Sequence, residues 1–393
     1  MGSLVSNYDA KLLKRQVYVT DRVKSMNESI YYNVDDIHNA ILNNKKVKFT
    51  YFDFDNNKLK SIAEAVKGTG IDTFVLDDGW FGKRDDDKSS LGDWKVAEYK
   101  LQKGLSGLIK EVNDCGLKFG IWFEPEMISP DSDIYREHPD WCLHTEGRDK
   151  SLARTQYVID YSRKEVRDHI YGMMHEILSN NNIDYVKWDF NRNLTEVACA
   201  QLPEERQGEV FHRFVLGTYE IMDRLTKDFP HILLENCSGG GGRFDPGMLY
   251  YSPQIWTSDN TDPIERLTIQ FGTSMCYPTS TMGAHVSACR RAGYETKMNV
   301  ALWGSFGYEL DIGILSDDEK QQIAEQISPM LTEYSMYVSL NPELFQRVKA
   351  VYEKRNELGL APDQMKLLDD NYKSFVRGGA NLSDEDKELY SKW

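Results

Sequence analysis

The sequence predicts an α/β fold, a (β/α)8 TIM-type barrel with a short N-terminal α/β segment and a C-terminal helical extension. Three observations support this prediction. The chain has 393 residues, enough for a barrel of about 250 residues plus flanking segments. Between about residues 51 and 326, strand-like and helix-like patterns alternate at the spacing of βα units. No Gly-x-Gly-x-x-Gly motif follows the early strand-like segments, which disfavours an open dinucleotide-binding sheet.

The composition narrows the classes of partner. The formal net charge is −15, and an acidic chain is a poor ligand for the phosphates of nucleic acids. The 6 cysteines include no Cys-x-x-Cys pair, which predicts reduced thiols and a cytoplasmic location. The first residues lack a basic stretch followed by an apolar one, so we expect no signal peptide. No apolar run reaches about 18 residues, so we expect no membrane partner.

Residues 1–50 are expected to form the N-terminal segment. Apolar residues recur at helical spacing in 34–41, which predicts an amphipathic helix. Residues 45–52 alternate between polar and apolar and are rich in β-formers, which predicts a strand.

Eight strands are predicted for the barrel, and helices fit between most of them, for example at 58–67 and 104–115. The predicted strands are 48–54, 73–77, 118–123, 185–189, 232–236, 254–258, 283–287 and 301–306.

The pattern changes at about residue 327. Segments 344–352 and 365–375 have helical periodicity, and Gly359 and Pro362 separate them as a stop and a restart. This predicts a helical hairpin rather than a ninth βα unit.

Carboxylates stand at the ends of the predicted strands, where barrel enzymes place their catalytic groups. They include Asp77, Asp78, Glu124, Asp189 and Asp259. Carboxylates accept hydrogen bonds from sugar hydroxyls, Arg and Lys donate them, and Trp covers the apolar face of a sugar. Glycoside cleavage needs two carboxyl groups beside one bond, and Asp189 and Asp259, two strands apart, are placed to face each other.

Five motifs at these strand ends together resemble glycoside hydrolase family 36, bacterial α-galactosidases that act on melibiose and raffinose-type sugars. The resemblance runs from about residue 51 to 326. The motifs are Asp77-Asp78-Gly79-Trp80, Trp122 with the following Phe-Glu-Pro-Glu, Lys187-Trp188-Asp189-Phe190-Asn191-Arg192, Glu235-Asn236-Cys237-Ser238-Gly239-Gly240 and Trp256-Thr257-Ser258-Asp259-Asn260-Thr261-Asp262.

The resemblance implies roles for these residues. Asp189 would be the nucleophile and Asp259 the acid/base of a retaining double displacement. Asp77 and Asp78 would bind the galactose hydroxyls near O4 and O6. The other implied substrate-binding residues are Arg154, Lys187 and Asn191 at ring hydroxyls, Trp122 beside the sugar, Trp188 in the same motif as Lys187, and Cys237 near the 2-position.

Each role has a structural alternative. Asp262 is close enough in sequence to replace Asp259 as the acid/base. Asp-Gly is turn chemistry, so Asp77 and Asp78 could form a turn after their strand. Three further alternatives are an ion pair of Asp189 with Lys187 or Arg192, a surface ion pair for Arg154, and an inert buried thiol for Cys237.

The two ends resemble other families. Residues 1–50 resemble the start of the effector-sensing WYL domain of bacterial regulators, in the stretches 31–41 and 49–53. Residues 327–393 resemble the helical N-terminal region of thimet-oligopeptidase-like peptidases, in 338–345 and 375–382, without the His-Glu-x-x-His zinc site. We therefore expect three units, 1–50, 51–326 and 327–393, in a natural or constructed chimera; one divergent protein is the alternative.

The predicted function is hydrolysis of terminal α-D-galactosides with retention of configuration. The alternative is a catalytically impaired sugar-binding or effector-sensing module, against which the presence of both Asp189 and Asp259 weighs. A peptidase fragment is disfavoured because the zinc motif is absent. No cofactor and no metal are expected, since His285 has no neighbours at metal-ligand spacing. The expected partners are small α-galactosides, and a homo-oligomer is compatible with the resemblance.

Overall fold

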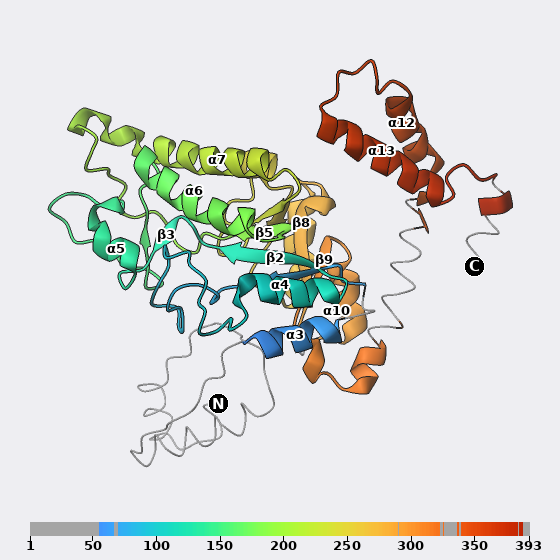
Figure 1. Ribbon diagram of the computed structural model, residues 1–393, viewed down its shortest axis with the longest axis horizontal. Helices are drawn as coiled ribbons and strands as arrows, with labels where there is room; N and C mark the ends of the chain where they lie inside the picture. The colour runs from blue at the N-terminus through green and yellow to red at the C-terminus, as the bar shows by residue number, and fades with distance from the viewer. Residues whose placement is uncertain are drawn as a thin grey trace, which may run out of the picture.

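The computed structural model describes residues 55–387, apart from 67–69, 290, 323–324, 326–335, 338 and 384. Figure 1 shows its main part as a parallel sheet with helices packed around it. The predicted segment 1–50 and the predicted strand 48–54 lie outside the described residues.

Seven parallel strands form the sheet, in the order β1-β2-β5-β6-β7-β8-β9. The first six confirm, within two residues, predicted strands of the barrel, and β9 overlaps the last predicted strand only in part. The strands are β1 Thr73–Leu76, β2 Lys118–Phe123, β5 Tyr185–Trp188, β6 Leu233–Asn236, β7 Gln254–Trp256, β8 Met282–Ser287 and β9 Ser305–Glu309.

Helices connect the consecutive strands of this sheet, as βα units require. They are α3 Asn56–Ala65 before β1, then α4 Gly104–Asp114, α6 Lys164–Ser179, α7 Val210–Asp228, α8 Pro246–Tyr251, α9 Pro263–Ser274 and α10 Tyr294–Ala301. Helix α4 buries Leu105, Leu108, Ile109 and Val112, one face of a helix, against the sheet. Strand β2 is buried in every residue after Lys118, as expected for a parallel strand covered on both faces.

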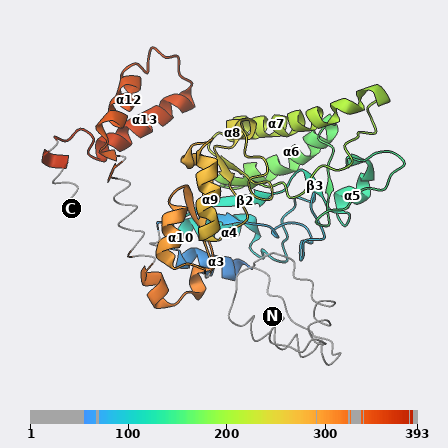
Figure 2. The same cartoon turned by 180° about the vertical axis from the view of Figure 1, so that it is seen from behind.

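The sheet is curled rather than flat. Its edge strands within the described residues are β1 and β9. Helix α3, which precedes β1, lies against the short helix η4, Ile312–Ile314, which follows β9. Figures 1 and 2 show this side of the molecule from both directions, with α3 beside α10. The two edges therefore curve towards each other, and the sheet forms a half-barrel.

Two features differ from the sequence prediction. The last strand was placed at 301–306, whereas Ala301 ends helix α10 and β9 begins at Ser305. A short apolar run fits a helix end as well as a strand, and packing on β8 decides between them.

The second feature is a long excursion after β2. It holds the antiparallel pair β3 Met127–Ile128 and β4 Tyr157–Val158, and the helices α5 Asp133–Glu137 and η1 Pro139–Trp141.

The predicted helical hairpin is present as α12 Pro342–Glu353 and α13 Pro362–Arg377. The two helices meet through stacked rings, with Tyr352 and Tyr372 centred 3.8 Å apart and Phe345 packed on Tyr372 and Phe375. Both views show the pair apart from the sheet. Among the described helices, none is long and apolar enough to cross a membrane.

Candidate active site

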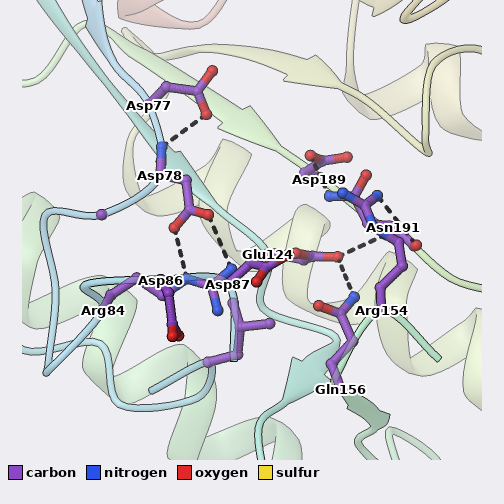
Figure 3. Close-up of polar contacts among 12 residues, drawn as sticks. Asp77, Asp78, Arg84, Asp86, Asp87, Glu124, Arg154, Gln156, Asp189 and Asn191 are labelled. Carbon is purple, nitrogen blue, oxygen red and sulfur yellow. Dashed lines mark hydrogen bonds and ion pairs between the residues drawn. The ribbon is translucent and has the colours of Figure 1, made fainter. Parts of the chain in front are cut away.

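The predicted site residues gather at the carboxyl edge of the sheet, where parallel strands end together. Strands β2 and β5 end side by side, because Phe123 pairs with Trp188. The backbone N–H of Asp189 then donates to the Phe123 carbonyl at 2.8 Å. Glu124 and Asp189, the next residues of the two strands, are therefore neighbours, as Figure 3 shows.

Asp189 is held by three hydrogen bonds. Its Oδ2 accepts from the Asn191 side-chain amide at 2.5 Å and from the Trp122 indole N–H at 3.2 Å. Its Oδ1 accepts from the Phe190 backbone N–H at 2.8 Å. The side chain is 7% exposed, so water competes little for these bonds. A carboxylate fixed in this way is ready to attack without first reorganising.

Lys187 links β5 to the end of β1. Its ammonium lies 3.0 Å from Asp77 Oδ2, and Asp77 itself is largely exposed. Burial lowers the pKa of Lys187, but the surrounding acidic groups, Asp77 above all, outweigh burial and raise that pKa well above its usual value. The ammonium therefore stays charged. Its ion-pair partner among the described residues is Asp77, so the structure does not show the alternative of an ion pair between Lys187 and Asp189.

Cys237 follows β6 and is buried. Burial raises the pKa of its thiol well above the usual value, and the charges of Asp189 and Asp259 raise it further while Lys187 lowers it. The thiol is therefore within electrostatic reach of both candidate catalytic aspartates.

Asp78 forms a bidentate ion pair with Arg84, with Nε and Nη2 each 2.9 Å from a carboxylate oxygen. Arg84 is buried and also donates to the Ser89 carbonyl. The ion pair holds the loop after β1 in place, as Figure 3 shows. The Asp78 carboxylate nevertheless remains partly exposed.

Asp259 follows β7 and is exposed. Its Oδ1 accepts from the Trp256 indole N–H at 3.1 Å. The buried Arg266 of α9 donates to the Ser258, Asn260 and Gly283 carbonyls at 2.6–3.0 Å. Arg266 thereby fixes the backbone on both sides of Asp259.

The glycine run after β6 packs directly on this backbone. A Cβ on Gly240 would lie 2.8 Å from Ser258 Cα and 2.9 Å from the Asp259 nitrogen, and Gly240 has a φ of +90°. Only glycine allows that approach without displacing the loop.

Asp262 has a different role. It caps helix α9, accepting from the Ile264 and Glu265 backbone N–H groups at 2.8 and 3.4 Å, and its other oxygen lies 3.2 Å from Arg291. Partial burial raises its pKa, but the helix N–H groups and Arg291 outweigh this and lower the pKa overall. An ionised cap is poorly suited to donate a proton, which favours Asp259 over Asp262 as the acid/base.

Arg154 and Thr155 precede β4 with left-handed backbones, φ +50° and +60°. Two successive non-glycine residues in this region are strained, and such strain gathers at functional sites. The exposed Arg154 guanidinium reaches the Asn191 carbonyl at 3.4 Å. The excursion after β2 thus delivers Arg154 to the end of β5, which the sequence pattern did not indicate.

The two tryptophans predicted to bind substrate are both buried. Trp122 is 2% exposed and reaches the site through its bond to Asp189, so it supports that carboxylate rather than offering an open face. Trp188 is 0% exposed, and its indole N–H donates to Glu126 at 2.7 Å. Trp188 therefore belongs to the core and presents no surface to a ligand; its prediction as a substrate-binding residue is corrected.

A profile of the melibiase family matches residues 19–338, more than half of the chain. The chain belongs to the melibiase family. The matched range contains the predicted barrel and extends beyond it at both ends.

This chain is 56% identical to the α-galactosidase AgaA of Geobacillus stearothermophilus over 285 residues, which are 71% of this chain and 39% of AgaA. It is 51% identical to the α-galactosidase Mel36A of Lactobacillus acidophilus over 300 residues, 75% of this chain and 41% of Mel36A. The crystal structure of AgaA superposes with a TM-score of 0.69 over 71% of this chain and 40% of AgaA. The chain thus spans about two fifths of the length of these relatives.

Several residues of the candidate site were given no role from the sequence. Glu124 and Trp256 stand inside quoted motifs but were given no role. Arg84 and Arg266 carry no motif signal, because their carbonyl and carboxylate partners are set by loop geometry.

Proposed function

We propose that this chain is the catalytic part of a retaining α-galactosidase, with Asp189 as nucleophile and Asp259 as acid/base. The observation that carries the proposal is the placement of two aspartates after β5 and β7, two strands apart at the same carboxyl edge of the sheet. Asp189 is bound by three donors and attacks the anomeric carbon. Asp259 is exposed to solvent. An acid/base needs this exposure, because it first protonates the leaving group and then activates a water molecule.

The relatives support this assignment. Structures of AgaA variants, each with an aspartate replaced, hold raffinose in one case and stachyose in the other. The two replaced aspartates are 70 positions apart in AgaA, and Asp189 and Asp259 are also 70 positions apart. Terminal α-galactosyl groups of such sugars are the proposed substrates.

The remaining predicted residues surround the galactose. Asp77 and Asp78 accept its hydroxyl groups, and Lys187, charged and next to Asp77, donates to them. Arg154, Asn191 and Cys237 line the ring, with Asn191 also holding Asp189. Trp122 acts through Asp189.

The wider organisation is part of the proposal. Strand 48–54 would pair with the free edges of β1 and β9 and close the (β/α)8 barrel. The division into 1–50, 51–326 and 327–393, the WYL-like and peptidase-like ends, their chimeric origin, the cytoplasmic location and a homo-oligomer stay predictions. The presence of both aspartates favours an enzyme over a sugar-binding module.

The experiment is incubation with matched aryl α- and β-galactosides, without added metal or cofactor. We expect phenol release from the α-anomer alone, with α-galactose as the first sugar formed. Asp189→Ala should abolish turnover for every leaving group, because no covalent intermediate can form. Asp259→Ala should impair poor leaving groups most and be partly rescued by azide. Preference for the β-anomer, or β-galactose as first product, would refute the proposal.

A further inference from the structure

Glu124 is a buried carboxyl group beside Asp189 that the proposed mechanism does not use. It follows β2 directly and is 2% exposed. Its Oε1 accepts from the Asn191 backbone N–H at 2.7 Å and from the Gln156 side-chain amide at 2.8 Å. Figure 3 shows the carboxyl group between these two residues, facing the end of β5.

Asn191 joins Glu124 to Asp189. Its backbone N–H is bound by Glu124, while its side-chain amide donates to Asp189 Oδ2 at 2.5 Å. The Arg154 guanidinium donates to its carbonyl at 3.4 Å. Because the backbone of Asn191 is fixed at both polar groups, its side chain has little freedom to leave Asp189.

A negative charge on Glu124 would face the charge of Asp189. Burial and the Asp189 charge raise the pKa of Glu124 to about 8, while Gln156, Asn191 and Arg154 lower it. The nearby Arg192 guanidinium donates to the Gln156 carbonyl at 2.7 Å rather than to Glu124. The carboxyl group therefore keeps its proton through neutral pH.

We propose that Glu124 is a positioning residue for the nucleophile: as a neutral carboxylic acid it anchors Asn191, which in turn orients Asp189 Oδ2. This inference rests on the proposed function, since it takes Asp189 as the attacking group. Loss of the Glu124 proton would place a second negative charge beside Asp189 and a departing phenolate, and so slow formation of the galactosyl-enzyme.

The test uses the full chain and an aryl α-galactoside whose phenol leaves without protonation. With this substrate kcat/KM reports attack by Asp189 rather than acid assistance by Asp259. The native protein is compared with Glu124→Gln, Glu124→Ala and the exposed control Glu146→Gln. Thermal melts confirm that each variant is folded.

We expect Glu124→Gln, which is neutral and keeps an oxygen acceptor, to retain kcat/KM within about threefold at pH 6.5. At pH 9.5 it should exceed the native protein by about tenfold, because the native Glu124 is then ionised. Glu124→Ala should lower kcat/KM by about 100-fold at both pH values, since it releases Asn191. Glu146→Gln should match the native protein at both pH values.

Three results would overturn the inference. Native-like kcat/KM in Glu124→Ala would exclude positioning, and equal impairment of Glu124→Gln and Glu124→Ala at pH 6.5 would mean that a charged carboxylate is needed. The third is a ¹³C NMR carboxyl signal, assigned by its loss in Glu124→Gln, that titrates near the ordinary 4.5 instead of about 8. If the native protein releases no phenol, the proposed function fails, whereas the carboxyl titration still decides the state of Glu124.

Discussion

Breaking the buried ion pair between Glu126 and Arg243 should destabilise the fold strongly. Glu126 is 0% exposed, and Arg243 Nη1 lies 2.8 and 3.1 Å from its two oxygens. The carboxylate also accepts from the Trp188 indole N–H at 2.7 Å and the Thr218 hydroxyl at 2.9 Å. Arg243 lies over the Phe190 ring at 4.3 Å. The pair therefore joins the ends of β2, β5 and β6 to helix α7.

Arg243→Met preserves most of the packing but leaves a buried carboxylate with two neutral donors. The expected cost is about 3–5 kcal/mol of unfolding free energy, the range for removing one partner of a buried ion pair. Glu126→Gln leaves the guanidinium without its carboxylate and should cost a similar amount. In the double variant neither charge is left uncompensated, so its loss should fall well short of the sum of the two single losses.

The assay is equilibrium unfolding in urea, followed by tryptophan fluorescence, with the exposed Arg148→Met as a control expected within about 0.5 kcal/mol of the native protein. A loss below about 1 kcal/mol for Arg243→Met, or a double variant equal to the sum of its singles, would refute the reasoning.

Three further outcomes are expected. Gly240→Ala should lower kcat by about 10- to 100-fold, because its Cβ meets the Asp259 backbone, whereas Gly239→Ala, with a similarly positive φ but open space, should cost only about 1 kcal/mol of stability; equal kinetics in both variants would contradict this. Asp262→Ala should cost about 1 kcal/mol through loss of a helix cap and leave the dependence on the leaving group unchanged, in contrast to Asp259→Ala. The pKa of Glu124 is raised from 4.5 to about 8 by folding, so its contribution to stability is complete below pH 4.5 and lost as the pH rises through 8. The stability of the native protein relative to Glu124→Gln should therefore fall by about 1.4 kcal/mol per pH unit within that window, and a constant difference in urea unfolding would count against it.

Much of the architecture follows from local pattern. Segment 119–123 is a continuous apolar run and became the buried part of strand β2, while 104–115 has helical periodicity and became α4. Such periodicities are imprinted by the burial of one face or of both, so they are readable without a structure. The polar residues at strand ends were predictable as one site for a related reason, since parallel strands deliver their carboxyl ends to one edge.

The sequence could not decide which of two similar residues does which job. Trp122 and Trp188 stand at the ends of neighbouring strands, yet one binds Asp189 and the other binds Glu126. Their assignments depend on which partners the folded chain brings near each indole. The roles of Asp259 and Asp262 are distinguished in the same way, because only the structure shows that Asp262 caps a helix.

What the tertiary structure alone decided is the contact between residues far apart in the chain. Arg243 reaches Glu126 across 117 positions, and Gly240 packs on the backbone of Asp259. The raised pKa of Glu124 also depends on the tertiary structure, because its burial and its nearness to Asp189 arise only when β2 and β5 pair. Local sequence determines the identity and order of the acids here, whereas their charge and orientation depend on a low-dielectric environment assembled from several strands.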